Sequence, residues 1–263
     1  MPTAPLPDGQ LHYQLDGPDD APVLVLSNSL GTDLRMWSPQ VERFAAHFRV
    51  LRYDTRGHGA SLVTDGPYTI EQNARDLLAL LDHLKLDAVS FCGLSMGGLI
   101  GQWLAIHQPN RLRRLVLCNT AAKIGSPDTW NPRIDGVLRD GAAGMRALRE
   151  GTLARWFTPA FVSANADVVE PIVETLQATS PVGYAANCAA VRDADFLGSL
   201  KPGNVPCLVV CGLHDPVTTP ADGRILAARI GASRVIDLEA AHLSNVEASE
   251  AFTREVLAFL LGN

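Results

Sequence analysis

The stretch Asp87–Gly98, DAVSFCGLSMGG, places a serine between a short apolar run and the start of a helical pattern. Its residues 93–97, GLSMG, match G-x-S-x-G, in which a nucleophilic serine stands on a sharp strand-to-helix turn. Such a turn needs glycine on both sides of the serine, because a side chain there would meet neighbouring backbone. The helix N-terminus also directs partial positive charge and free N–H groups at the serine. We therefore interpret Ser95 as a nucleophile rather than as a plain helix N-cap.

Strand-like runs alternate with helix-period segments on both sides of this turn. Before residue 122 the runs are LHYQLDG, PVLVLSN, RVLRYD, DAVSFCG and LRRLVLCNT, and after residue 195 they are VPCLVVCG and SRVIDLE. This alternation is typical of a mostly parallel sheet flanked by helices. Residues 123–195 are helix-like, broken by Gly and Pro, with no convincing strand. The sequence therefore predicts an α/β fold with a core formed by residues 1–122 and 196–263, and an inserted helical cap, residues 123–195.

Composition narrows the classes of partner. The chain has 263 residues and a net charge of −6, and this mild acidity argues against a nucleic-acid partner. The N-terminal residues lack the apolar run of a signal peptide, and no apolar stretch has the length of a membrane span. Four of the five cysteines lie in strand-like runs, and the pair Cys207 and Cys211 lacks a second cluster for a metal. We expect a cytoplasmic protein with reduced core cysteines and no membrane partner.

A serine nucleophile needs a base, and the base needs an acid that orients it. Among seven histidines, His242 lies between the last strand and the terminal helix, near the sheet edge where open α/β sheets bind ligands. Asp215 follows the buried run CLVVCG and gives the order Ser–Asp–His. His58 and Asp54, both in RYDTRGHG, are the competing base and acid. Asp54 is disfavoured because it precedes the serine.

The loop SNSLGTD, residues 27–33, follows an early strand where hydrolases with parallel sheets usually carry a His-Gly pair. Oxyanion donors in this architecture are backbone N–H groups, here those of Met96 and Leu30. Asn28 keeps a side-chain donor and acceptor, and Ser29 stays small. We expect an oxyanion loop rebuilt from these residues; the alternative is a plain polar loop.

Taken together, the chain resembles the α/β-hydrolases, and in particular the bacterial 3-oxoadipate enol-lactonases. The similarity runs nearly end to end, through SNSLGTDLRMW, RYDTRGHGAS, FCGLSMGG, NTAAKIG, PVGYAANCAAVRDADF and AAHLSNVE. The nucleophile turn and RGHG identify only the superfamily, whereas SNSLGTD and the segment PVGYAANCAAVRDAD carry the specific assignment.

The resemblance implies Ser95, Asp215 and His242 as a catalytic triad, with the Leu30 and Met96 amides as oxyanion donors. It implies hydrolysis of 3-oxoadipate enol-lactone to 3-oxoadipate through an acyl-enzyme, in the β-ketoadipate route of aromatic-compound breakdown. No metal or cofactor is implied. The sequence does not fix the oligomeric state, and a homo-oligomer is one of the alternatives.

An anionic lactone needs a cation in or under the cap. Arg133, close to Trp130, is the first candidate, and Arg192 is the second. A charge-assisted hydrogen bond to the substrate carboxylate is worth ~1.5–3 kcal/mol. We expect Trp130, Trp156 and Tyr184 either to wall the pocket or to fill the core of the cap.

Three other functions remain open. The same triad would serve a general carboxylesterase or a cofactor-free perhydrolase of the haloperoxidase type. A haloalkane dehalogenase is disfavoured, because an aspartate would be expected at Ser95. A ligand receptor on the same fold is an alternative from another class, and multiple turnover would separate it from an enzyme.

Overall fold

The computed structural model describes residues 2–262, in which eight strands form one sheet in the order β1-β2-β4-β3-β5-β6-β7-β8. The strands β3, β4, β5, β6, β7 and β8 run parallel; β2 pairs antiparallel with β4, and β1 pairs antiparallel with β2 at the edge of the sheet. This arrangement confirms the predicted mostly parallel sheet. The strand bounds are β1 Thr3–Leu6, β2 Gly9–Asp16, β3 Val23–Ser27, β4 Arg49–Tyr53, β5 Val89–Leu94, β6 Leu112–Cys118, β7 Cys207–Gly212 and β8 Arg234–Leu238.

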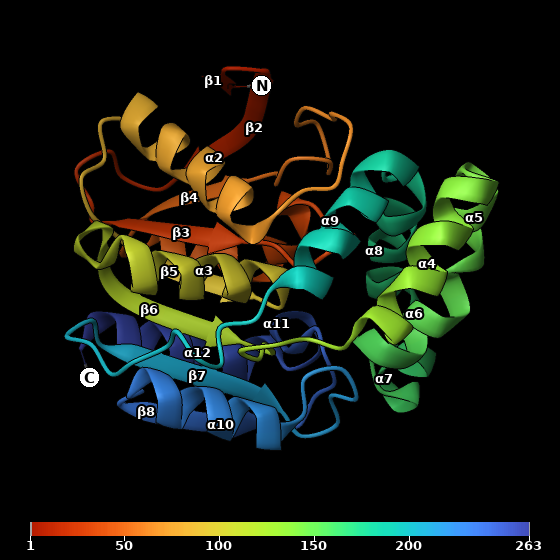
Figure 1. The fold of residues 1–263 in the computed structure, drawn as a ribbon. Helices are drawn as coiled ribbons and strands as arrows, with labels where there is room; N and C mark the ends of the chain where they lie inside the picture. Colours follow the sequence, from red (N-terminus) through yellow and green to blue (C-terminus); the bar gives the residue numbers. More distant parts are fainter. Residues whose placement is uncertain (1, 263) are drawn as a thin grey trace.

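Helices cover both faces of the sheet. Helices α1 and α12 pack against each other, as do α2 and α3, and Figure 1 shows α3 in front of the sheet and α12 behind it. Every residue of the central strand β5 is buried between these layers. The elements that accompany the sheet are η1 Leu34–Trp37, α1 Ser38–Ala45, α2 Ile70–His83, α3 Met96–His107, η2 Pro109–Arg111, α10 Pro220–Ile230, α11 Ser244–Glu247 and α12 Ser249–Leu261.

Six helices lie between β6 and β7, and Figure 1 shows them grouped at one end of the sheet. They are α4 Pro127–Asp140, α5 Ala142–Ala147, α6 Arg149–Trp156, α7 Pro159–Ala164, α8 Ala166–Ala178 and α9 Pro181–Asp193. The two ends of this segment meet, because the Phe196 N–H donates to the Ala122 carbonyl at 2.8 Å. We call residues 123–195 the helical segment; its role as a cap stays a prediction.

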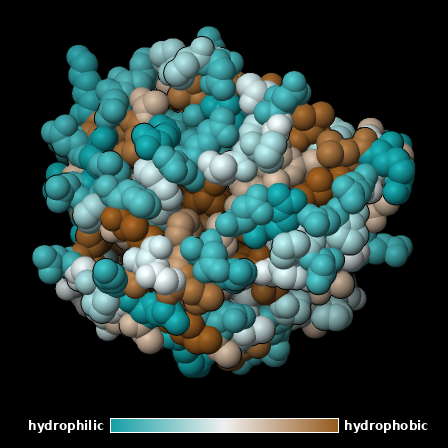
Figure 2. Space-filling view, in the orientation of Figure 1, coloured by the Kyte–Doolittle hydropathy of each residue, from teal (hydrophilic) through white to brown (hydrophobic). Residues whose placement is uncertain are grey.

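Three further observations concern the cysteines, the helices and the surface. The five cysteines are free and buried, with the Sγ atoms of Cys92 and Cys118 3.7 Å apart on neighbouring strands. Across residues 2–262, no helix combines the length and the apolar character needed to cross a membrane. Figure 2 shows hydrophilic side chains over much of one face, with hydrophobic ones interspersed among them.

Candidate active site

Ser95 lies at the junction of β5 and α3 in a strained backbone conformation. Its φ of 56° and ψ of −113° fall in a region that residues other than glycine rarely adopt. A Cβ atom on Gly93 would lie 2.3 Å from the Gly97 carbonyl oxygen, and one on Gly97 would lie 2.2 Å from the Ser27 carbonyl oxygen. These contacts confirm the steric reason for glycine on both sides of the serine.

His242 and Asp215 form a hydrogen-bonded pair from two loops far apart in the chain. The Nδ1 atom of His242, after β8, lies 2.8 Å from Oδ2 of Asp215, after β7. The carboxylate also accepts hydrogen bonds from the Val217 and Thr218 amides, from the Thr218 hydroxyl and from the Asn119 side-chain amide. His242 and Asp215 are each only 3% exposed.

The electrostatics of this pair favour an ionised acid. Burial alone would raise the pKa of Asp215, but the charge and hydrogen bond of His242, with the bonds from Asn119 and Thr218, lower it to about 2. An ionised carboxylate can only accept a hydrogen bond, so Nδ1 of His242 carries the proton. This tautomer leaves Nε2 of His242 free to take a proton from a nucleophile.

Ser95 and His242 line one small cavity of about 40 Å³, together with residues of the early loop and of the helical segment. Among the residues that the helical segment contributes are four predicted substrate contacts: Trp130, Arg133, Trp156 and Tyr184. The other lining residues are Ser29, Leu30, Ile124, Thr152, Arg155, Val191 and Val217.

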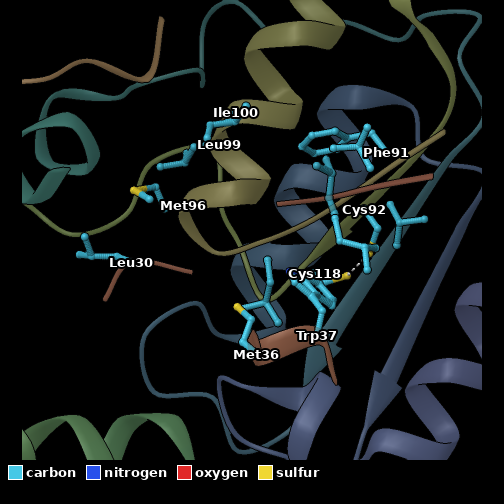
Figure 3. Close-up of a cluster of buried hydrophobic side chains, with 14 of the residues drawn as sticks. Leu30, Met36, Trp37, Phe91, Cys92, Met96, Leu99, Ile100 and Cys118 are labelled. Atoms are coloured by element: carbon cyan, nitrogen blue, oxygen red, sulfur yellow. Dashed lines mark hydrogen bonds between the residues drawn. The ribbon is translucent and has the colours of Figure 1, made fainter. Parts of the chain in front are cut away.

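Two backbone N–H groups beside this cavity have no protein acceptor. Within residues 2–262, the amides of Leu30 and Met96 make no hydrogen bond, whereas those of Gly31, Ser95 and Gly97 all do. Figure 3 shows Leu30 and Met96 in the buried cluster around the start of α3. The two free donors are those that the sequence predicts for an oxyanion hole.

Asn28 holds the early loop in place. Its side chain donates to the Tyr53 carbonyl at 2.8 Å and accepts from the Trp37 indole N–H at 2.9 Å. Its own carbonyl accepts from the Gly97 amide at 3.0 Å, which ties the loop to the nucleophile turn. The loop is therefore a built structure, and the alternative of a plain polar loop is disfavoured.

The competing acid, Asp54, is engaged elsewhere. One carboxylate oxygen lies 2.7 Å from Nδ1 of His12 and accepts from the Ala60 amide, and the other accepts from the Leu34 amide. These bonds fasten the chain before and after β4 and do not involve His242. The competing base, His58, accepts a hydrogen bond from the Gly31 amide and is not part of the cavity lining.

Two arginines line the cavity. The Arg133 guanidinium lies 4.9 Å from the centre of the Trp130 ring, and Arg155 donates to the Thr152 hydroxyl at 3.1 Å. Burial, and then the nearby charge of Arg133, lower the pKa of Arg155. Within residues 2–262 neither arginine forms an ion pair with a carboxylate. The site thus holds positive charge without a protein anion to match it.

A profile described as alpha/beta hydrolase fold matches residues 22–249 of the chain. The chain belongs to this α/β-hydrolase family. It is 45% identical over 253 residues to 3-oxoadipate enol-lactonase 2 of Acinetobacter baylyi, which covers 96% of this chain and 94% of that protein. It is 39% identical to 3-oxoadipate enol-lactonase 1 of the same organism, covering 95% and 92%. The crystal structure of the enol-lactonase from Burkholderia xenovorans superposes with a TM-score of 0.95 at 48% identity, covering 99% and 100%.

The structure places one predicted substrate contact of this α/β-hydrolase away from the cavity. Arg192 does not line the cavity: its guanidinium donates to both carboxylate oxygens of Asp193, at 2.7 and 2.8 Å, and to Asn131. The cation that sequence reasoning missed is Arg155, at the end of α6. No sequence signal distinguishes these two arginines, because each lies near the end of a helix whose buried face depends on tertiary packing.

A second residue that sequence reasoning missed is Asn119, directly after β6. Its side chain donates to Asp215 and to the Ala241 carbonyl, and it accepts from the Ser244 hydroxyl. It therefore joins the acid loop to the histidine loop of this α/β-hydrolase. A usable signal existed, because Asn119 follows a buried strand directly, as Ser95 does.

Proposed function

We propose that this α/β-hydrolase hydrolyses 3-oxoadipate enol-lactone to 3-oxoadipate, in the β-ketoadipate route of aromatic-compound breakdown. The observation that carries the proposal is one cavity that holds a strained serine, a histidine bonded to a buried carboxylate, and two arginines without a carboxylate partner. The names of the similar enol-lactonases support the same substrate.

The proposed reaction begins with proton transfer from the Ser95 hydroxyl to Nε2 of His242. The Ser95 oxygen attacks the lactone carbonyl, and the Leu30 and Met96 amides bind the negative oxygen that forms. Collapse of this intermediate breaks the ring C–O bond and leaves an acyl-enzyme and an enolate. The His242 imidazolium gives its proton to the enolate, which becomes a ketone, and His242 is neutral again. Asp215 stays ionised and stabilises the imidazolium of His242.

Water completes the reaction. His242 removes a proton from the water molecule, which attacks the acyl-enzyme carbonyl. The bond to the Ser95 oxygen then breaks, His242 returns the proton to that oxygen, and the newly formed carboxylate of 3-oxoadipate is released. The atoms balance as lactone plus one water. Each step uses groups of the protein and water alone.

The single carboxylate of the substrate, which does not react, is assigned to Arg133 and Arg155. We propose that Trp130, Trp156 and Tyr184 wall the same pocket and exclude water, and that the helical segment acts as a cap. A dry setting strengthens the attraction between arginine and carboxylate. This charge separates an acidic lactone from a neutral ester of similar size.

The test follows loss of enol-lactone absorbance beside hydrolysis of a neutral aryl ester such as p-nitrophenyl acetate. We expect many turnovers per enzyme with the lactone and a lower kcat/KM with the ester. Ser95→Ala should abolish both activities with an unchanged circular dichroism spectrum, since removal of a triad member costs up to ~10⁶-fold in kcat. Turnover of the ester alone would identify a general carboxylesterase, and less than one turnover of either would identify a receptor.

A further inference from the structure

His58, in the RGHG turn after β4, is a buried imidazole that the proposed reaction does not use. Its Nε2 atom accepts a hydrogen bond from the Gly31 amide at 2.9 Å. Gly31 is the next residue after Leu30, the proposed oxyanion donor of the loop. The His58 imidazole therefore bonds the backbone next to the Leu30 N–H, the group proposed to donate to the oxyanion.

The protonation state of His58 suits this contact. Its Nδ1 atom lies 3.3 Å from the Arg56 carbonyl, which can only accept, so Nδ1 carries the proton and Nε2 has a free lone pair. Burial lowers the pKa of His58 to about 4, although the charges of Asp54 and Asp33 oppose this shift. The Arg56 side chain is directed at two other carboxylates, Asp8 and Asp76. At neutral pH the imidazole is thus an uncharged acceptor.

The helical segment covers the same glycine from the other side. A Cβ atom on Gly31, whose φ is 80°, would lie 2.6 Å from the Leu176 side chain and 3.2 Å from the Tyr184 ring. The neighbouring amides have weaker partners, since Ser29 donates to the Met36 sulfur at 3.3 Å. The Thr32 amide and hydroxyl bond the Ser29 carbonyl, at 3.3 and 2.8 Å, and close the turn that contains Leu30 and Gly31. The bond to His58 is the hydrogen bond of the Gly31 amide itself.

The helical segment also contacts the RGHG turn itself. The Asn187 side chain, on α9, donates to the Arg56 carbonyl at 2.7 Å and accepts from the Asn73 side chain at 2.8 Å. A Cβ atom on Gly57 would lie 2.8 Å from the Gly183 Cα, so the turn and α9 pack backbone against backbone. The position of His58 is thus set by both the core and the helical segment.

We propose that His58 is a positioning residue for the oxyanion hole: by holding the Gly31 amide, it keeps the preceding Leu30 N–H directed at the cavity. This proposal rests on the oxyanion hole of the proposed function. Without the acceptor, the Leu30–Gly31 backbone can rotate, and the loop donor is lost for part of the time. The reaction would slow, while binding of the ground-state substrate would change little.

The experiment compares His58→Gln with His58→Leu. A glutamine oxygen can reach the place of Nε2 and accept from Gly31, whereas leucine has similar volume and no acceptor. Because loss of a whole oxyanion donor costs about 10²–10³-fold in kcat, we expect His58→Leu to lower kcat by about 10- to 100-fold, with KM within about 3-fold. His58→Gln should recover most of the kcat. If the leucine variant does not fold, His58→Asn replaces it, since its shorter side chain does not reach Gly31.

Phenylboronic acid supplies an equilibrium readout, because its serine adduct places an oxygen in the oxyanion hole. Its inhibition constant should rise in His58→Leu in step with the loss of kcat. Equal kcat in the leucine and glutamine variants, or a lower melting temperature with unchanged kcat and inhibition constant, would overturn the proposal. Each variant is assayed with both the enol-lactone and p-nitrophenyl acetate. Failure of the proposed function would appear as a wild-type enzyme inactive on the lactone, while the His58 effect on the ester persists.

Discussion

At the residue scale, the chemistry of the site depends on a buried carboxylate that stays ionised. Asp215 accepts hydrogen bonds from His242, Asn119 and the two residues Val217 and Thr218 of its own loop. Asp54 is also buried, but its bonds hold His12 and two loop amides. Only the first of these carboxylates can orient the candidate base.

Replacing Asp215 and Asp54 in turn by asparagine distinguishes the catalytic carboxylate from the structural one. We expect Asp215→Asn to lower kcat by about 10⁴-fold, because an amide no longer fixes the tautomer of His242 or stabilises its imidazolium. Asp54→Asn should retain far more activity. Initial rates with p-nitrophenyl acetate measure both, and a larger loss in Asp54→Asn would mean that Asp54 is the catalytic acid.

The same Asp215 variant has a consequence for acid stability. The pKa of Asp215 is about 2 in the folded chain, against an ordinary value of 3.8, so the unfolded state binds the proton more tightly. The stabilisation is therefore complete above about pH 4 and is lost as the pH falls toward 2. It amounts to about 2 kcal/mol. Urea unfolding of wild type between pH 5 and pH 2.5 should show this loss, and Asp215→Asn should show a shallower decline.

The arginines of the cavity give a prediction about substrate charge. We expect Arg133→Ala to lower kcat/KM for the enol-lactone by roughly 10- to 150-fold, which is the value of a charge-assisted hydrogen bond. The neutral aryl ester should lose much less. Arg192→Ala is the matched control, because this arginine pairs with Asp193 away from the cavity. Equal losses on both substrates in Arg133→Ala would place the anion site elsewhere.

Two features of the site could be predicted from the sequence: the order of its residues along the chain and their positions after the ends of strands. Ser95, Asp215 and His242 each follow a strand, so topology alone brings them to one edge of the sheet. Arg155 could not be found in this way, because its place at the cavity depends on how α6 packs against α5 and α8. Arg192 was the second candidate from the sequence, but its guanidinium is bound by the adjacent Asp193 and by Asn131.

At the element scale, the nucleophile turn depends on contacts that leave no space for a side chain. We expect Gly97→Ala to destabilise the fold by about 2–4 kcal/mol, because its Cβ atom would lie 2.2 Å from the Ser27 carbonyl oxygen. Gly136→Ala, in α4, is the matched control: the nearest atom to its Cβ is 4.0 Å away, and we expect a gain of about 0.5–1 kcal/mol. Urea unfolding of both variants measures the difference, and equal stability would contradict the steric argument.

The strands were predictable where burial produces an apolar run. The predicted strands PVLVLSN and DAVSFCG correspond to β3 and β5, which are buried within the parallel sheet. The strand β1, Thr3–Leu6, was missed because it contains Pro5 and pairs only with β2 at the edge of the sheet. Proline is tolerated at such an edge, so the composition that argues against a strand is allowed there.

At the scale of the whole molecule, the helical segment is bonded to the loop that carries His242. The Leu243 amide donates to the Trp156 carbonyl at 3.0 Å. The Glu247 carboxylate accepts from the Thr158 amide at 3.1 Å and from the Ala241 amide at 2.8 Å. The bonds of Glu247 thus join the helical segment to the loop that precedes His242.

A pair of glutamate variants tests this coupling. Glu247→Ala removes the acceptor shared by Thr158 and Ala241, next to His242, whereas Glu170→Ala removes only an ion pair with Arg149 inside the helical segment. Because misplacement of a catalytic group by about 1 Å costs up to ~10²-fold, we expect Glu247→Ala to lower kcat by roughly 10-fold or more on both lactone and aryl ester. Glu170→Ala should leave kcat within about 2-fold, since an exposed pair contributes little to stability and this one touches no catalytic loop. Equal kcat in the two variants would mean that the segment and the histidine loop act independently, and that the docking of Glu247 is structural alone.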